Sequence, residues 1–388
     1  MTEFTPHPLD HLPTPAAIID LPTLRRNASL MLDRARHLGV RLRPHVKTHK
    51  TVEGALIQTQ QPGRPITVST LAEASWFAQA GFDDMTWALP VSPQRIADVV
   101  TMSKRLRRFG VITDDLAVAA QLDEAARSES ITLRVQLKVN VGANRAGVDP
   151  HGDLALSLAR RLHESKNLHF EGLLGHEGQS YRASGGAAQM REIAAEAAEQ
   201  MNTLVRRCKA AGIEVGEVSL GSTPTAIHAR DLPGVTELRP GNYLLFDMTQ
   251  VELGACAVTD VAFSVLTTVI GNYPERNVLV VDAGALALSL DPGVTSPGRA
   301  TGHGLVVGAN GEHLPSAVRV AHLSQEHGII FTNDQEHLRA LRPGDRLRVL
   351  PNHSCLAASL FPAYFIQDGN RIIDRWVPAR GWNLPSEI

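Results

Sequence analysis

The sequence is poor in cysteine and in aromatic residues. Only 3 of its 388 residues are cysteine, and Phe, Trp and Tyr together make up 5%. Cys208, Cys256 and Cys355 are odd in number and far apart, which excludes a disulfide framework of the kind found in small secreted domains. Thiol or metal chemistry remains open to these three residues.

Long apolar runs and an excess of one charge are also missing. No stretch approaches the roughly 18 apolar residues that a membrane span needs, and the first residues lack the basic and apolar segments of a secretion signal. The cytoplasm is therefore the expected location. With 38 basic and 40 acidic side chains the net charge is -2, too small to recruit nucleic acid or anionic lipid. We expect a small-molecule partner.

Helical and strand patterns alternate from residue 23 onwards. Eight strand candidates are separated mostly by Ala-rich helical stretches; they lie at 40–46, 65–70, 84–90, 108–113, 131–139, 168–175, 216–222 and 236–246. Such alternation indicates an α/β protein with a parallel sheet, and eight units match a closed (β/α)8 barrel of the TIM type. An open doubly wound sheet is the alternative.

After residue 246 the pattern becomes β-rich and is punctuated by Gly, Pro, Asn and Asp. This change predicts two domains. The barrel is expected over 24–255, and a mainly β domain is expected to combine 1–23 with 256–388. The early strand candidate at 14–20 could pair with the later domain.

Polar residues follow several of the barrel strands, where the active site of such a barrel lies. This rule selects Lys47 and His49 after the first strand, Asn140 and Arg145 after the fifth, 176–181 after the sixth, and Ser222 and Thr223 after the seventh. Lys47 is the sharpest candidate, because neighbouring basic groups favour the free amine that condenses with an aldehyde cofactor. A solvated basic turn is the alternative.

Two glycine turns resemble phosphate cradles. Gly221, Ser222 and Thr223 precede a helix whose first turn contains proline, and residues 239–243 offer a second turn. An ordinary helix cap is the alternative. Motifs for nucleoside triphosphates and dinucleotides are missing. Lys138 alternates with Gln136 on the fifth strand, so it is expected to point into the barrel and to need a partner.

The segment PNHSC, 351–355, contains a candidate metal site. On an extended segment His353 and Cys355 would face the same side, and nitrogen together with thiolate favours zinc. Chance spacing, or a lone thiol in an apolar strand, is the alternative.

Eight segments together resemble the fold-type III pyridoxal-phosphate (PLP) enzymes. The match is closest to the branch of D-serine dehydratases, D-threonine aldolases and 3-hydroxy-D-aspartate dehydratases or aldolases. The segments are IIDLPTLRRNASLML, RPHVKTHK, LKVNVGANRAGV, GHEGQSY, LGSTPT, RPGNY, SQEHG and PNHSC, and they follow one another across nearly the whole chain.

This resemblance implies roles for particular residues. Lys47 would hold PLP as a Schiff base and act as the catalytic base, Tyr181 would lie near the pyridine nitrogen, and Arg145 at the phenolic oxygen. The implied phosphate ligands are Ser222, Thr223, Gly241 and Asn242. His353 and Cys355 would bind a divalent metal, zinc rather than manganese or cobalt, beside the β-hydroxyl of the substrate. A homodimer is also implied.

The expected activity is a PLP- and metal-dependent dehydratase of β-hydroxy D-amino acids such as D-serine or D-threo-3-hydroxyaspartate, which releases a 2-oxo acid and ammonia. Cys355 favours this activity, because a thiolate suits zinc and the aldolases look richer in carboxylates. The alternatives are an aldolase that releases glycine and an aldehyde, and a non-catalytic PLP carrier.

Overall fold

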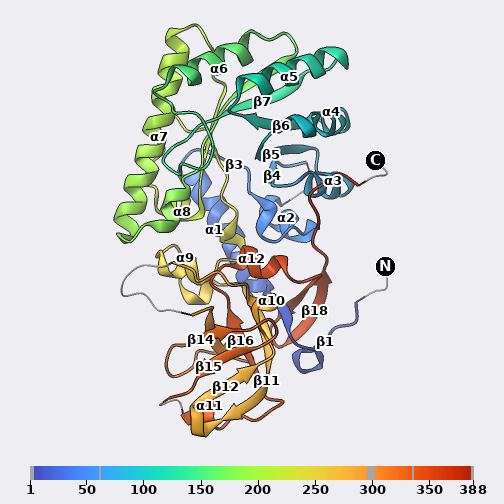
Figure 1. Ribbon diagram of the computed structural model, residues 1–388, viewed down its shortest axis with the longest axis vertical. Coiled ribbons are helices and arrows are strands. Elements are labelled where there is room, and N and C mark those ends of the chain that lie inside the picture. Colours follow the sequence, from blue (N-terminus) through green and yellow to red (C-terminus); the bar gives the residue numbers. More distant parts are fainter. Residues whose placement is uncertain (1–3, 61–62, 295–301, 334–335, 386–388) are drawn as a thin grey trace. The chain divides into compact units, whose positions relative to one another are not determined.

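The computed structural model describes residues 4–60, 63–294, 302–333 and 336–385. The chain divides into two units (Figure 1). One combines residues 1–28 with 242–378, and the other combines 29–241 with 379–388. Among the described residues no helix is both long and apolar enough to cross a membrane.

Eight parallel strands form the sheet of the 29–241 unit. They are β3 (Arg41–Leu42), β4 (Ile66–Val68), β5 (Asp84–Pro90), β6 (Arg108–Thr113), β7 (Leu133–Lys138), β8 (Leu168–Leu174), β9 (Glu217–Leu220) and β10 (Glu237–Leu238). The pairing order is β3-β10-β9-β8-β7-β6-β5-β4. A parallel bridge between His45 and Thr67 joins the two ends, and the Thr67 N–H donates to the Pro44 oxygen at 2.8 Å. The (β/α)8 barrel is therefore confirmed, and the open sheet is wrong.

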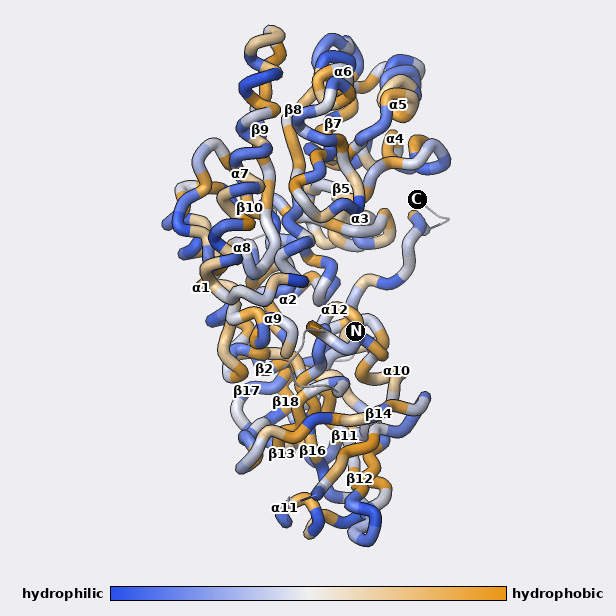
Figure 2. The backbone as a smooth tube through the Cα atoms, turned by 60° about the vertical axis from the view of Figure 1, so that its left-hand side comes forward, coloured by the Kyte–Doolittle hydropathy of each residue, from blue (hydrophilic) through white to orange (hydrophobic). Residues whose placement is uncertain are grey.

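Helices alternate with these strands and lie outside them (Figure 1). They are α1 (Leu21–His37), α2 (Val52–Thr59), α3 (Leu71–Gln79), α4 (Ile96–Arg105), α5 (Leu116–Ser128), α6 (Asp153–Glu164), α7 (Gly186–Ala210) and α8 (Thr223–His228). Thr51, Thr70 and Asp115 cap three of them by accepting a backbone N–H from the first turn. Hydrophobic and hydrophilic residues alternate along α5 and α6 (Figure 2), as in helices with one buried face.

The last barrel strand is shorter than the predicted 236–246 segment. Strand β10 has two residues, and the 3-10 helix Asn242–Leu244 follows soon after it. Pro240 offers no N–H to a strand neighbour. A side chain at Gly241 would place its Cβ 2.7 Å from the His45 oxygen, so glycine permits this close approach. The predicted strand was too long because its end is set by a contact with a residue distant in the sequence, which the local pattern does not report.

Charged side chains fill the barrel near the beginnings of its strands. Arg43, 1% exposed, donates to Glu237 at 2.8 Å and to Asp84 at 2.6 Å. Arg108 makes two hydrogen bonds to the carboxylate of Glu171, at 2.8 and 2.6 Å. Such pairs offset part of the cost of removing charges from water. The polar residues selected from the sequence follow the other, C-terminal ends of the strands.

The other unit is built from mainly antiparallel strands. They are β1 (His7–Pro8), β2 (Ala16–Asp20), β11 (Phe263–Tyr273), β12 (Val278–Val281), β13 (Leu305–Gly308), β14 (Val318–Leu323), β15 (Gly328–Phe331), β16 (Arg346–Leu350), β17 (Tyr364–Asp368) and β18 (Arg371–Trp376). The pairings β11-β12-β15-β14-β13-β16 return to β11, which closes a ring of six strands. Strand β2 pairs antiparallel with β11 and parallel with β17, as expected of the early strand.

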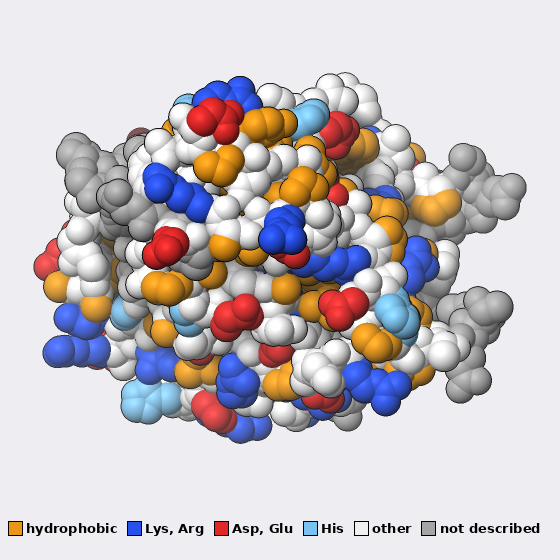
Figure 3. Space-filling model, turned by 90° about the horizontal axis from the view of Figure 1, so that it is seen from below, with side chains coloured by type: hydrophobic (Ala, Val, Ile, Leu, Met, Phe, Trp, Pro, Cys, Tyr) orange, Lys and Arg blue, Asp and Glu red, His pale blue; other side chains and the backbone are white. Residues whose placement is uncertain are grey.

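In the described part of this unit, four short α-helices lie between the strands: α9 (Met248–Glu252), α10 (Ala285–Leu288), α11 (Glu336–Arg339) and α12 (Ser354–Ser359). Helix α10 falls in a segment expected to be β-rich, and its Ala-Leu sequence has high helix propensity. Basic and acidic side chains are interspersed over the face drawn in Figure 3. That distribution agrees with a net charge of -2.

Candidate functional site

Lys47 lies in the 3-10 turn Val46–Thr48, which residues 43–45 connect to strand β3. Its backbone N–H donates to Nδ1 of His45 at 3.4 Å, and its side chain is exposed. Burial, and then the charge of Lys47, lower the pKa of His45 well below the usual range. The same two causes lower the pKa of His176. The amine of Lys47 therefore stands beside two imidazoles that are neutral near pH 7.

The tautomer of His176 follows from its hydrogen bond. Its Nδ1 lies 3.1 Å from the carbonyl oxygen of Gly221, and a carbonyl can only accept, so Nδ1 carries the proton. Because the ring is neutral, Nε2 is left as an acceptor. The ring of Tyr181 lies 6.4 Å away, centroid to centroid.

The other two basic side chains of the Lys47 turn have structural partners. His49 is fully buried, with Nδ1 3.0 Å from Thr51 Oγ1 and Nε2 3.0 Å from Gln58 Oε1. Burial lowers its pKa to about 4. Lys50 forms an ion pair with Glu73 at 3.0 Å. Lys47 thus differs from both neighbours in presenting an exposed amine.

Lys138 is a second lysine at a strand end. It is the last residue of β7, is 6% exposed, and donates to the Val139 oxygen at 3.2 Å. Burial, then the charges of Arg239 and Arg145, lower its pKa to about 7. The partner expected from the sequence is thus a carbonyl oxygen, which solvates the amine without neutralising it.

Arg239 and Glu177 are the buried charges that sequence reasoning missed. Arg239 donates from Nε to Ser219 Oγ at 2.7 Å and also bonds the Gly175 carbonyl. Burial lowers its pKa to about 10. Glu177 accepts from the Gly221 N–H at 2.9 Å, and burial raises the pKa of its carboxyl. In the sequence, Arg239 and Glu177 were marked only by belonging to the segments RPGNY and GHEGQSY.

Ser222 caps helix α8. Its Oγ lies 2.8 Å from Thr225 Oγ1 and 2.9 Å from Ser180 Oγ, and a reciprocal capping box is formed. The ordinary cap, weighed as the alternative to a phosphate cradle, is therefore present. Thr223 is buried as the first residue of the helix. A phosphate role for this turn stays a prediction.

The loop after β7 carries Arg145, whose side chain is exposed. Asn140 organises this loop by accepting from the N–H groups of Gly142 at 3.2 Å and Asn144 at 3.0 Å. Arg145 lies near enough to Lys138 to lower the pKa of that amine. These strand ends thus gather four basic side chains, Lys47, Lys138, Arg145 and Arg239. Glu177 is the buried carboxylate among them. This charge balance fits a cofactor with a phosphate dianion.

His353 and Cys355 lie in the β-rich unit at the start of helix α12. The extended segment expected here is wrong, because α12 begins at Ser354, directly after His353. The carboxylate of Asp247 fixes this start by accepting from the Ser354 N–H at 3.0 Å. The two side chains still lie together, because His353 and Cys355 are hydrogen-bonded to each other.

The surroundings of His353 favour positive charge. Its Nδ1 lies 2.9 Å from Asp291 Oδ2. Burial lowers the pKa of His353, but hydrogen bonds with Asp291 and Cys355 outweigh burial and raise it to about 11. A divalent cation fits this environment. Among the described residues no group of three or more His, Cys, Asp or Glu side chains could hold a metal, so this pair would leave coordination positions open.

The side chain of Asn242 makes its hydrogen bonds at the start of helix α12. Its Nδ2 lies 2.6 Å from Asp247 Oδ2, 3.1 Å from Ser354 Oγ and 3.7 Å from Cys355 Sγ. Its side-chain amide therefore supports the segment that carries the candidate metal ligands, His353 and Cys355. The phosphate role expected for Asn242 is left to its backbone N–H.

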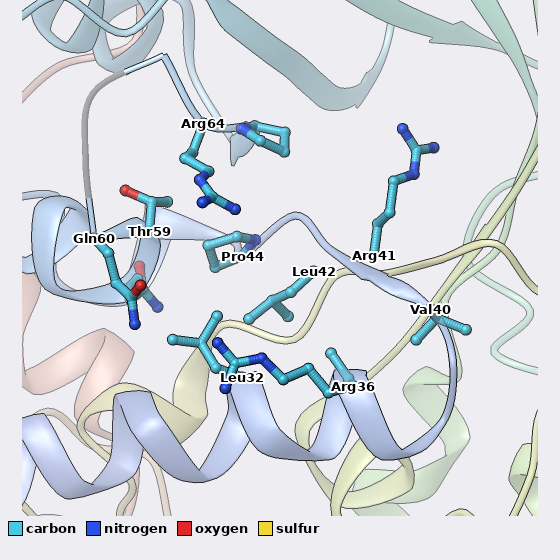
Figure 4. A pocket seen from close by; sticks show the side chains of 12 residues that line it. Leu32, Arg36, Val40, Arg41, Leu42, Pro44, Thr59, Gln60 and Arg64 are labelled. Carbon is cyan, nitrogen blue, oxygen red and sulfur yellow. The ribbon is translucent and has the colours of Figure 1, made fainter.

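A cavity of about 300 Å³ lies elsewhere in the barrel unit (Figure 4). Its lining comes from α1, β3, the end of α2 and residues just before β4, and includes Leu32, Arg36, Leu42, Gln60 and Arg64. The residues predicted for catalysis and cofactor binding are not part of this lining. The functional site at the strand ends therefore stays a prediction, on which this cavity has no bearing.

Two family models match the chain. "Alanine racemase, N-terminal domain" covers residues 19–249, and "Putative serine dehydratase domain" covers residues 262–367. These matches, together with the barrel, define the class as PLP lyases of fold type III.

Characterised relatives define the branch. D-threo-3-hydroxyaspartate dehydratase of Delftia sp. (strain HT23) is 36% identical over 96% of this chain and 98% of its own length. Its solved structure has a TM-score of 0.91 and covers 97% of this chain and 100% of that one. D-serine dehydratase of Dictyostelium discoideum is 33% identical over 96% and 98% of the two chains. The chain belongs to this dehydratase branch, and the family resemblance is confirmed.

Two solved variants and one further relative bear on the site. Solved variants of the D-threo-3-hydroxyaspartate dehydratase have a cysteine replaced by alanine, in a metal-free form, and a histidine replaced by alanine; the two positions are two residues apart. A 3-hydroxy-D-aspartate aldolase of Paracoccus denitrificans is 26% identical over 95% of this chain and 92% of its own length. The aldolase is thus the more distant relative.

Proposed function

We propose that this protein is a PLP- and divalent-metal-dependent dehydratase of β-hydroxy D-amino acids, such as D-threo-3-hydroxyaspartate or D-serine. The products are a 2-oxo acid and ammonia. The observation that carries the proposal is that a chain of the dehydratase branch holds an exposed lysine, Lys47, at a barrel strand end and a hydrogen-bonded His-Cys pair, His353 and Cys355, in its β-rich unit.

When bound, PLP supplies an electron sink for the α-carbon, and a divalent metal stabilises the leaving hydroxyl as a Lewis acid. Lys47 would hold the cofactor, and its Nζ, when free, would take the α-proton. The neutral rings of His45 and His176 add no positive charge beside that amine. The neutral ring of His176 keeps Nε2 as a hydrogen-bond acceptor near that amine.

The remaining residues bind and orient. We propose that Tyr181 lies near the pyridine nitrogen and Arg145 at the phenolic oxygen. The turn of Ser222 and Thr223, with Gly241 and the backbone of Asn242, holds the phosphate. Positive charge from Lys138 and Arg239 would favour an anionic cofactor.

His353 and Cys355 hold the metal, and zinc is our proposal because imidazole nitrogen and thiolate suit it better than they suit manganese or cobalt. The same ligand chemistry supports the dehydratase over the aldolase, as does the lower identity to the aldolases. The spacing of the two replaced residues in the Delftia enzyme matches that of His353 and Cys355.

The test is a product analysis. Protein loaded with PLP and zinc is incubated separately with D-serine, D-threo-3-hydroxyaspartate and D-threonine, and 2-oxo acid, ammonia and glycine are measured in each sample. We expect equal amounts of 2-oxo acid and ammonia from at least one substrate. Glycine with an aldehyde would make the protein an aldolase, and no product from any substrate would favour the non-catalytic carrier.

Two further statements belong to the proposal. We propose a homodimer, which sedimentation equilibrium of the loaded protein tests. We also propose that the protein acts in the cytoplasm, which fractionation of the producing cells tests. The domain boundaries at residues 24 and 255 stay predictions, and limited proteolysis checks them.

A further inference from the structure

We propose that Asp291 is a positioning residue for the metal ligand His353, and that it fixes which ring nitrogen faces the metal. The inference rests on the proposed metal pair. Oδ2 of Asp291 lies 2.9 Å from Nδ1 of His353. Because a carboxylate only accepts, Nδ1–H donates to it, and Nε2 is the nitrogen left for a metal.

Asp291 is itself held in place. Its second oxygen, Oδ1, accepts from the Gly293 N–H at 2.8 Å, and its N–H donates to Ser289 Oγ at 3.2 Å. The Asn352 Nδ2 donates to the Asp291 carbonyl at 3.1 Å. With both backbone groups and both carboxylate oxygens bonded, the side chain has little freedom to turn away from His353.

Asn352, which bonds the Asp291 carbonyl, is itself held by a hydrogen bond. Its Oδ1 accepts from Arg319 at 3.0 Å, and Arg319 also pairs with Glu252. Asn352 immediately precedes His353 in the chain, so one network holds both the ligand and its acceptor. A carboxylate bonded to the outer nitrogen of a metal-bound histidine fixes ring orientation and raises the basicity of the ligand, and its loss typically costs 10- to 100-fold in metal affinity.

Cys355 is positioned by a different carboxylate. Asp247 accepts from the Ser354 N–H at 3.0 Å and from Asn242 Nδ2 at 2.6 Å, and so fixes the helix start that carries the thiol. Asp291 therefore orients the imidazole of His353, and Asp247 holds the helix start that carries Cys355.

The test is zinc affinity, measured by competition with a chromophoric chelator. Asp291→Asn has one oxygen for two donors, those of Gly293 and His353, and Asp291→Ala has none. We expect both variants to bind zinc 10- to 100-fold more weakly, with a shifted absorption spectrum of the cobalt(II)-loaded protein. The matched control is Asp374→Asn, because Asp374 accepts from the ring nitrogen of Trp376 at 3.0 Å in the same unit.

Thermal unfolding separates positioning from a purely structural role. The metal-free variants lose stability with the hydrogen bonds to Gly293 and His353. A positioning role predicts that they also lose part of the increase in midpoint that zinc gives to the wild type. Wild-type zinc affinity in both Asp291 variants would overturn the inference. A loss as large as that of His353→Ala would also overturn it, by making Asp291 a ligand. A wild-type protein that binds no zinc would instead refute the proposed metal site.

Discussion

Arg43 and Glu237 form an ion pair inside the barrel, with Nε 2.8 Å from Oε2 and each side chain 1% exposed. Asp84 accepts a second hydrogen bond from Arg43, at 2.6 Å. Removing one partner of a buried pair leaves an uncompensated charge. The barrel therefore depends on this arginine for stability, because its guanidinium bonds the first residues of two strands, Asp84 of β5 and Glu237 of β10.

We expect Arg43→Met to lower the free energy of unfolding by about 3–5 kcal/mol, measured by urea denaturation. Arg107→Met is the matched control. Arg107 pairs with Asp83 at 3.1 Å on the surface, where such pairs contribute about 0–1 kcal/mol. Equal effects of the two substitutions would contradict the role of the buried network.

Lys138 should make stability depend on pH. Its pKa is about 7 in the folded protein against 10.5 for an ordinary solvated lysine, so between these values the unfolded chain binds more protons. The contribution of Lys138 to the free energy of unfolding is therefore lowest below pH 7. It increases towards pH 10, by at most about 1.4 kcal/mol per pH unit. The advantage of Lys138→Met over the wild type should therefore shrink across this range, in urea denaturation of cofactor-free protein. A constant difference would show that the amine is not desolvated.

Gly241 should be intolerant of a side chain. In Gly241→Ala the new Cβ would stand 2.7 Å from the His45 oxygen and 2.9 Å from the His45 Cβ, two residues before Lys47. We expect PLP affinity to fall at least about tenfold, since reacting groups must be held closely, as measured by equilibrium dialysis. Gly152→Ala, where the nearest atom is 3.5 Å away, is the control and should bind PLP normally.

Metal removal should separate the two parts of the chemistry. Cys355→Ala, or treatment with a chelator, is expected to abolish turnover while the visible absorbance of bound PLP persists, because the thiol and Lys47 belong to different units. Readdition of zinc should restore the chelated wild type but not the variant. Full activity in the presence of the chelator would remove the metal from the mechanism.

Local patterns were sufficient for the barrel. The eight strand candidates coincide with eight strands because short apolar runs between amphipathic helices report on local burial. The two errors near the site have distant causes. The end of β10 is set by the approach of Gly241 to His45, and the helix at Ser354 is capped by Asp247, 107 residues earlier.

The candidate site was only partly accessible to sequence reasoning. Lys47 stood out through its position after a strand, and His353 and Cys355 through their ligand chemistry. Arg239, Glu177 and Asp291 gave no such signal, because a charged side chain in a sequence is most often exposed. Their roles follow from burial and from partners that only the folded chain brings together.

The most direct test of the account is the identity of the lysine that binds the cofactor. Holoprotein is reduced with borohydride, digested, and mapped by mass spectrometry, with Lys47→Ala as the control. We expect the cofactor on Lys47 of the wild type, and in the variant a loss of both the label and the visible absorbance with the far-UV circular dichroism unchanged. A label on Lys138, or an unchanged visible band in Lys47→Ala, would contradict the account.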